Sequence, residues 1–420
     1  MSTTGPAATA GTAPARARAQ RRTLTVLVAG QILSGAGLAA GITVGALLAQ
    51  DMLGSTDLAG LPSALFTAGS ALAAVAVGRI SQARGRRPGL AAGYLAGALG
   101  SAGVIAAAAL DNPVLLFIAL FVYGAGTATN LQARYAGADL AAPAHRARAV
   151  STVLVATTLG GVVGPNLAAP TGTLAEHLGI PALAGPFLLA GAAYALAALV
   201  LAAWLRPDPL LLARELQRSE QQGAGDAAAT ATGPDRVRRP TLLLGAVTMI
   251  LTQLVMVAIM TMTPVHMHDH GHGTAASGLV IAVHVGAMYL PSPLTGWLVD
   301  RHGPTAVAAG SGLTLLAAGL VAAAAPADSV ALLALALALL GLGWNLGLVS
   351  GTAMITDAAP LATRARTQGT VDVAIAIAGA TGGLASGVVV SAAGYAVLSL
   401  AGGLLALAVL PAIAATARPR

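Results

Sequence analysis

The sequence predicts an all-α membrane protein with twelve transmembrane helices arranged as two six-helix bundles. Of the 420 residues, 56% are hydrophobic and only 9% are charged, whereas soluble domains carry about 25% charged residues. Apolar runs of about 20 residues, each long enough to cross a bilayer as a helix, recur along nearly the whole chain. A polar break near the middle separates the runs into two groups of six.

The runs define the expected elements in order. Those before the break cover residues 23–50, 60–80, 89–110, 113–135, 148–170 and 184–205. Those after it cover residues 240–263, 274–298, 304–325, 328–350, 366–388 and 391–414. We therefore expect an N-terminal bundle at 23–205, a cytoplasmic linker without apolar periodicity at 206–239, and a C-terminal bundle at 240–414. Residues 1–22 and 415–420 are expected to be cytoplasmic tails, the first of them disordered.

The placement of charge predicts the orientation. All 22 basic residues are arginines, and they lie at the N-terminus and in alternate loops, whereas the intervening loops carry acidic residues without arginine. This positive-inside pattern predicts that both termini are cytoplasmic. The net charge of +7 therefore reflects topology, and no nucleic-acid partner is expected. Because the chain has no cysteine, it offers neither disulfides nor thiolate ligands.

The second half of the chain repeats the first at an offset of 218 residues. The segment 78–87 returns at 296–303. Asp139, Arg146 and Arg148 return as Asp357, Arg364 and Arg366. A shared offset over separate motifs indicates duplication of a six-helix unit. Parallel repeats of this size are typical of transporters whose substrate site lies near the membrane midplane between the halves.

The loop between the second and third helices of each half resembles the signature of the major facilitator superfamily, Gly-x-x-x-Asp-Arg-x-Gly. The second copy matches fully, with Gly296, Asp300, Arg301 and Gly303. The first copy has Gly78, Gly85 and Arg86, but Gln82 stands where the aspartate is expected, so a charged gate is not implied in that half. The resemblance implies the major facilitator fold, alternating access without ATP hydrolysis, gating by these loops and no enzymatic activity.

Methionine and histidine gather around the seventh and eighth predicted helices. Ten of the seventeen such residues lie between Met256 and Met288. Met256 and Met260 form one pair with i, i+4 spacing, and His284 and Met288 form another. This spacing places both members of a pair on one helix face. Thioether and imidazole donors suit a soft metal ion, copper(I) above all, although methionine also fills apolar gaps in ordinary packing.

The two pairs together resemble the signature of the CcoA-like copper importers. Carried over position by position, Met256, Met260, His284 and Met288 would bind copper as the transported substrate, with no resident cofactor. The resemblance implies copper import across the inner membrane of a bacterium. We expect a monomer embedded in membrane lipid.

Four histidines at alternate positions follow the seventh helix. An extended outer loop would present His266, His268, His270 and His272 on one side as a collecting site for metal ions, and the alternative is a solvated polar loop.

An alternative function is a proton-coupled exporter of drugs or small metabolites. The segment from Gly160 to Pro165 on the fifth helix resembles a motif of such exporters, although close-packed glycines also serve helix packing. Asp372, in the eleventh helix, is the clearest intramembrane acid; it would carry a coupling proton or belong to a polar network near the cytoplasmic surface. A metalloenzyme is disfavoured, because the soft donors have no adjacent carboxylate.

Overall fold

The computed structural model describes residues 7–39, 48–49, 51–52, 61–223 and 238–417. Over these residues all regular structure is helical, and ten helical segments are long and apolar enough to cross a membrane. The all-α membrane fold expected from the sequence is confirmed. Residues 40–47 and 50 of the predicted first membrane helix, residues 53–60 after it and residues 224–237 of the linker lie outside the described residues.

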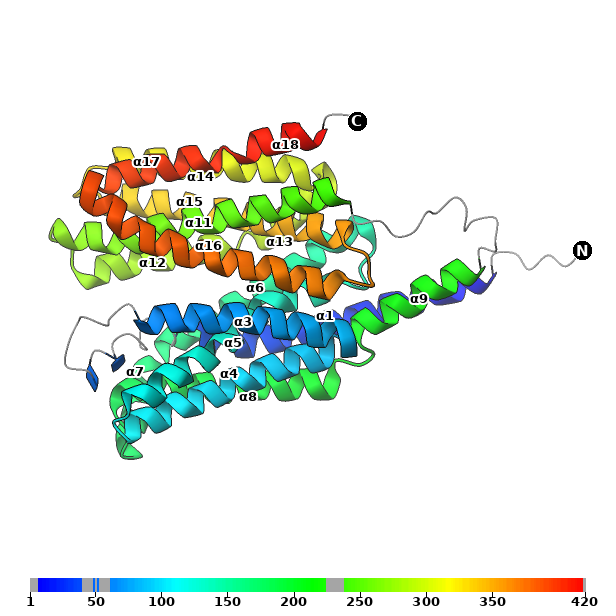
Figure 1. The fold of residues 1–420 in the computed structure, drawn as a ribbon, viewed down its shortest axis with the longest axis horizontal. Helices are drawn as coiled ribbons and strands as arrows, with labels where there is room; N and C mark the ends of the chain where they lie inside the picture. Colours follow the sequence, from blue (N-terminus) through cyan, green and yellow to red (C-terminus); the bar gives the residue numbers. More distant parts are fainter. Residues whose placement is uncertain (1–6, 40–47, 50, 53–60, 224–237, 418–420) are drawn as a thin grey trace, which may run out of the picture.

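The first half of the chain forms the lower layer in Figure 1. Its helices are α1 (Ala7–Ala39), α3 (Leu61–Arg84), α4 (Arg86–Ala109), α5 (Pro113–Ala138), α6 (Arg146–Asn166), α7 (Ala168–His177) and α8 (Gly185–Trp204), with short 3-10 turns at Pro143–His145 and Ala182–Ala184. Buried aromatic rings fill its centre: Tyr94 stacks on Tyr194 at 5.8 Å, and Tyr123 meets Phe187 edge-on at 5.3 Å.

The second half forms the upper layer (Figure 1). Its helices are α11 (Arg239–Asp269), α12 (Thr274–Tyr289), α13 (Ser292–His302), α14 (Pro304–Ala324), α15 (Val330–Ala358), α16 (Arg364–Ala393), α17 (Tyr395–Ala406) and α18 (Val409–Ala417). A second buried core of Leu, Val, Ala and Met side chains holds these helices together, and it also includes Ala138, Ala147, Val150 and Leu154 of the first half. Figure 1 shows α3 of the first half lying along α16 of the second.

Helix α1 begins well before the apolar run that predicts it. The prediction that residues 1–22 are disordered is wrong for residues 7–22, which are helical. Two side chains hold this extension: Arg16 Nε donates to the Leu140 carbonyl at 3.0 Å, and Gln20 Nε2 donates to the Gly137 carbonyl at 2.7 Å. The apolar-run criterion does not register such a segment, because polar contacts to α5 and its following loop replace burial in lipid. At the other end of the chain, residues 415–417 of the expected tail still belong to α18.

The linker is partly a helix. Residues 209–223 form α9 (Pro209–Gly223), so the expectation of a linker without apolar periodicity is wrong for this stretch. Asp208 starts the helix by accepting from the amides of Leu210 and Leu211 at 3.1 and 3.2 Å. Leu210 and Ala213 are buried. The helix is short, so its few apolar positions do not stand out among the polar residues that surround them.

The predicted eighth helix is divided into α12 and α13. The division follows Leu290, where Pro291 and Pro293 remove two backbone donors. Asn345 of α15 supports the break, because its Nδ2 donates to the Met288 carbonyl and to Ser292 Oγ, both at 2.7 Å. The Thr295 hydroxyl donates to Asn345 Oδ1 at 2.6 Å. One buried amide therefore satisfies three polar groups at the broken helix.

Replacing Asn345 should destabilise the protein measurably. Asn345→Leu keeps the volume and leaves several buried polar groups unpaired, at about 1–3 kcal/mol each. We expect a clear fall in the thermal unfolding midpoint of the detergent-solubilised protein. Thr314→Ala is the matched control, because the Thr314 hydroxyl binds only the Gly310 carbonyl of its own helix. Equal midpoints for the two variants would contradict the assigned role of Asn345.

Candidate functional site: a gate between the halves and a buried histidine

The two halves meet at the end of the molecule where α3 ends and α6 and α16 begin. We call this the arginine-rich end, because residues 79–87, 134–148 and 364–366 lie there. The start of α1, α9 and the end of α18 lie at the same end, on the right in Figure 1. A Cβ added to Gly78 would stand 2.9 Å from the Ala365 carbonyl oxygen, and one added to Gly296 would stand 2.5 Å from Ser151 Oγ. Glycine at these two loop-motif positions therefore permits the close contact of the halves.

Each half caps a helix of the other. Asp300 of α13 accepts from the amides of Ala147 and Arg148 at the start of α6, at 3.0 and 3.2 Å. Gln82 of α3 accepts from the amides of Ala365 and Arg366 at the start of α16, at 2.8 and 3.4 Å. The donors and acceptors correspond under the 218-residue repeat.

Gln82 therefore replaces the expected aspartate without loss of the contact. Its Oε1 supplies the acceptor, and its Nε2 also donates to the Ala362 carbonyl at 2.6 Å. An aspartate has no such donor. This half of the gate thus lacks the charge, as the sequence predicts, but it keeps the cap and adds a hydrogen bond.

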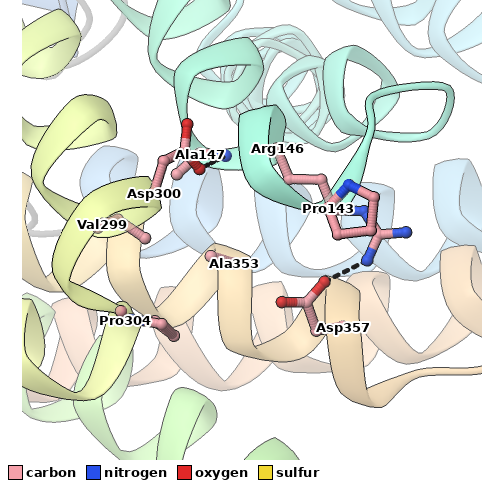
Figure 2. Close-up of a pocket in the computed structure, with 9 residues that line it drawn as sticks. Pro143, Arg146, Ala147, Val299, Asp300, Pro304, Ala353 and Asp357 are labelled. Atoms are coloured by element: carbon pink, nitrogen blue, oxygen red, sulfur yellow. Dashed lines mark hydrogen bonds and ion pairs between the residues drawn. The ribbon is translucent and has the colours of Figure 1, made fainter.

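Ion pairs surround the caps. Arg86 pairs with Asp139 at 2.8 Å and donates to Gln368 of α16, and Arg364 of α16 lies 3.9 Å from Asp139. Arg146 pairs with Asp357 on the opposite side. Figure 2 shows this second pair at a pocket between the halves, with Asp300 facing Ala147 on its other wall.

Three other residues of the predicted loops have local roles. Gly85 and Gly303 have φ of 98° and 85°, which only glycine adopts without strain. Arg301 is exposed, with its guanidinium 5.1 Å from the centre of the Trp297 ring. Among the described residues it makes no hydrogen bond or ion pair to the other half.

A deeper contact joins the halves behind the caps. Arg134 of α5 pairs with Asp372 of α16 at 2.8 Å, and both side chains are buried. Asp372, named from the sequence as the clearest intramembrane acid, therefore has a partner in the opposite half, and the two residues lie in the interface itself.

His284 of α12 is fully buried and oriented by a backbone group. Its Nδ1 lies 2.9 Å from the Leu337 carbonyl oxygen of α15. Because a carbonyl only accepts, Nδ1 carries the hydrogen and Nε2 holds a free lone pair. Nε2 is buried and has no hydrogen-bond partner among the described residues. A polar atom in this condition costs free energy until a ligand or a donor meets it.

The methionines that accompany His284 lie at related depths. Met256 and Met288 are buried in the core of the second half, and Met260 packs against that core. A Cβ added to Gly347 of α15 would stand 2.4 Å from Thr252 Oγ1 of α11, so these two residues lie side by side. Asn345 of α15 binds the Met288 carbonyl. Since α11 and α15 run in opposite directions, Met256, one turn beyond Thr252, stands near the level of Met288. The pairs thus flank α15 from α11 and α12.

The four histidines after Met262 do not form the extended segment expected from their spacing. His266 and His268 lie within α11, and His270 caps it. His266 stacks on Tyr395 with ring centres 4.4 Å apart, and His272 Nε2 donates to the Ala327 carbonyl at 2.7 Å. Over the described residues no three His, Asp or Glu side chains gather where they could hold a metal ion. The predicted collecting site is wrong in geometry, because helical spacing sends alternate side chains to different faces.

The glycines of the fifth predicted helix serve close packing. A Cβ on Gly160 would stand 2.2 Å from the Ile32 carbonyl oxygen, and one on Gly164 would stand 2.6 Å from that of Ala36. They let α6 approach α1 closely.

Sequence reasoning did not single out Asn345, or the neighbouring Trp344. Trp344 Nε1 donates to Gln253 Oε1 of α11 at 2.8 Å, and its ring meets Tyr289 edge-on at 5.7 Å. The available signal was the pair Trp344-Asn345 inside an otherwise apolar run, because polar groups within a membrane helix mark partners or function.

Comparison with known proteins identifies relatives over most of the chain. A family model described as Major Facilitator Superfamily matches residues 27–291 and 245–420. The chain is 58% identical to the uncharacterized MFS-type transporter YdeG of Bacillus subtilis (strain 168), over 94% of this chain and 91% of that protein. It is 31% identical to the riboflavin transporter RfnT of Brucella anthropi, over 85% and 86%. The structure resembles the human organic anion transporter MFSD10, with a TM-score of 0.74, 17% identity and coverage of 94% and 99%.

Removing the Gln82 cap should loosen the arginine-rich end. Ser151 is buried there beside Gly296, and since the chain has no cysteine, Ser151→Cys supplies a single thiol whose alkylation reports opening. A helix cap contributes about 1 kcal/mol, so Gln82→Ala should speed alkylation about fivefold. The measurement is the rate of modification by a water-soluble maleimide.

A matched control is Thr370→Ala, whose hydroxyl binds only the Arg366 carbonyl of its own helix. Its alkylation rate should equal that of the parent. A Gln82→Ala rate no faster than this control would show that the cap does not hold the gate.

Proposed function

This chain belongs to the major facilitator superfamily of membrane transporters, and we propose that it is a secondary transporter whose cargo is copper. The proposal is import across the inner membrane of a bacterium by alternating access, with Met256, Met260, His284 and Met288 as the copper ligands. It rests first on one observation, the buried Nε2 of His284, which has no hydrogen-bond partner in the part of the chain that the structure describes.

The hydrogen bond from Nδ1 to Leu337 is the kind of support that orients a metal-binding imidazole. Histidine ligands usually donate their second ring nitrogen to a carbonyl or carboxylate, which fixes the tautomer and the ring plane. In this protein His284 Nδ1 donates to the Leu337 carbonyl at 2.9 Å. The other ring nitrogen, Nε2, is buried and can accept a metal ion. A soft cation would meet it without the cost of a buried negative charge.

The surrounding donors favour copper(I) over harder ions. Thioether sulfur selects copper(I), whereas calcium, magnesium and manganese prefer oxygen ligands. The chain has no cysteine, so the site would hold its ion without thiolate bonds. Neutral ligands bind a cation less tightly than thiolates do, which suits an ion that is to be released.

The contacts that close the arginine-rich end support entry of the transported ion from the outer side of the membrane. The positive-inside pattern predicts that the arginine-rich end is cytoplasmic. Caps and ion pairs join the halves at that end. With the cytoplasmic end closed, cargo would enter from the outer side, and rocking of the halves would then open the route inward.

A second candidate is transport of a flat heteroaromatic metabolite, which fits the alternative of a proton-coupled carrier of drugs or small metabolites. Two observations favour it: the 31% identity with a riboflavin transporter, and the cluster of Trp344, Tyr289 and Gln253. Aromatic faces and an amide are the groups that stack on and hydrogen-bond a heteroaromatic ring.

Copper uptake by cells that express the intact chain tests the first proposal. Uptake should exceed that of empty-vector cells and fall at least about tenfold in Met256→Leu and His284→Ala, since each loses a ligand interaction of more than about 1.4 kcal/mol. The matched control is Met249→Leu, a buried methionine on the same helix that packs against Gly351. It should transport as the parent does.

Two outcomes would contradict copper import. One is uptake by the intact chain no higher than the vector; the other is an equal loss in Met249→Leu. Riboflavin uptake measured in the same cells separates the candidates, because the second predicts riboflavin uptake that depends on Trp344 and is indifferent to Met256→Leu.

A further inference from the structure

A cavity lies beside the Gln82 cap, where α3 of the first half meets α16 of the second. We call this line of contact the first seam; Figure 1 shows the two helices side by side. The cavity has a volume of about 340 Å³ and is lined by Arg79, Gln82 and Ala83 of α3 and by Arg366 of α16. A water molecule takes up about 30 Å³ in the liquid, so the cavity has room for a larger polar group.

The two arginines of the cavity have no acidic partner. Arg79 and Arg366 come from opposite halves and are both exposed. In the part of the chain that the structure describes, neither side chain makes an ion pair or a hydrogen bond. Asp139 and Asp208, which lie at the same end of the molecule, are engaged elsewhere: Asp139 pairs with Arg86, and Asp208 accepts from amides at the start of α9. Two positive charges therefore line one cavity without a negative charge to balance them.

The corresponding arginine at the second seam, where α13 meets α6, does have an acid. Under the 218-residue repeat, Arg366 corresponds to Arg148, and Gln82 corresponds to Asp300. Arg148 Nε lies 3.6 Å from Asp300 Oδ2. At the first seam a neutral amide stands in the place of that carboxylate. The exchange of aspartate for glutamine keeps the helix cap but leaves Arg366 without its anion.

The position of Arg79 lies at the level of lipid headgroups. Its counterpart at the second seam is Trp297, and tryptophan is enriched where a membrane meets water. Apolar side chains are exposed on the same helix faces towards the membrane interior. Leu72, two turns from Arg79, is 59% exposed, and Ile377, three turns from Arg366, is 57% exposed. A charged cavity below two apolar helix faces matches a molecule with a polar head and apolar tails.

We propose that this cavity binds a negatively charged phosphate group between Arg79 and Arg366, and that an anionic phospholipid carries the phosphate. The planar guanidinium group donates two parallel hydrogen bonds to phosphate oxygens. The acyl chains lie along the exposed faces of α3 and α16. Because the arginines belong to opposite halves, one phosphate bridges them only while the halves are in contact here. The lipid therefore stabilises the closed arrangement of the arginine-rich end, whatever the cargo is.

Lipid binding to the purified full chain in detergent tests the site. Native mass spectrometry measures how much phosphatidylglycerol is bound as its concentration rises. Arg79→Gln and Arg366→Gln should each weaken the tightest binding at least about tenfold, because each loses hydrogen bonds to a charged group. Arg84→Gln is the matched control, since it removes an exposed arginine of the same helix that does not line the cavity. It should bind the lipid as the parent does.

A Gln82→Asp variant separates a binding site from a general attraction between basic protein and acidic lipid. The aspartate can supply the cap, as Asp300 does at the second seam, and it gives Arg366 the acid that Arg148 has. Phosphatidylglycerol binding should weaken at least about tenfold although both arginines remain, because a hydrogen-bonded ion pair then competes with the phosphate. Unchanged binding in this variant would contradict the proposed site.

Two further ligands identify what carries the phosphate. Phosphatidylcholine has the same tails without net charge, and it should bind at least about tenfold more weakly than phosphatidylglycerol. Inorganic phosphate lacks the tails and should not displace phosphatidylglycerol at equal concentration; displacement would overturn the lipid as the carrier. Equal binding of the two lipids, binding that survives the loss of both arginines, or an equal loss in Arg84→Gln overturns the site itself.

The effect on the gate is measured with the Ser151→Cys variant in vesicles. Alkylation by a neutral maleimide should be slower in phosphatidylglycerol than in phosphatidylcholine. This slowing should be at least about fivefold greater than in the same variant with Arg79→Gln added, because a ligand of the closed arrangement stabilises it by mass action. Equal slowing with and without Arg79 would show that the bound lipid does not hold the end closed.

Discussion

The amides that begin α6 and α16 constrain the whole interface. The first N–H groups of a helix have no partner within it, and at the arginine-rich end these groups face the opposite half of the chain. Asp300 and Gln82 meet them from α13 and α3. Each half therefore completes a helix of the other, and closing the end satisfies both halves at once. The glycines at 78 and 296 are needed because the acceptors reach the amides only if the backbones come into contact.

The sequence predicts the fold well, because long apolar runs and a repeated loop are local signals that lipid enforces. The features it misses depend on contacts between distant segments. Residues 7–22 and 209–223 look like polar connections, yet Gln20, Arg16 and Asp208 find partners that hold them as helices. Pro291 and Pro293 indicate a break in the predicted eighth helix. The hydrogen bond from Asn345 that supports this break depends on the packing of α15, so the local sequence does not predict it.

Among the candidate metal ligands too, the features set by local sequence are predicted and those set by distant contacts are not. The spacing of His284 and Met288 predicts one helix face, and both side chains are buried in the core of the second half. The spacing of His266 to His272 predicts one side of an extended strand, which fails because α11 continues through Asp269. Hydropathy does not mark that continuation, since polar residues extend the helix beyond the apolar run. The orientation of His284 by Leu337 is a contact across 53 positions, which no local pattern encodes.

The contacts of the gate differ in strength in a way that orders its opening. A helix cap contributes about 0.5–2 kcal/mol, and a partly exposed pair such as Arg146 with Asp357 contributes about 1 kcal/mol or less. The sealed pair of Arg134 with Asp372 costs about 3–5 kcal/mol to break when one charge is left alone. The outer contacts can therefore exchange with water at small cost, while the deep pair dominates the barrier.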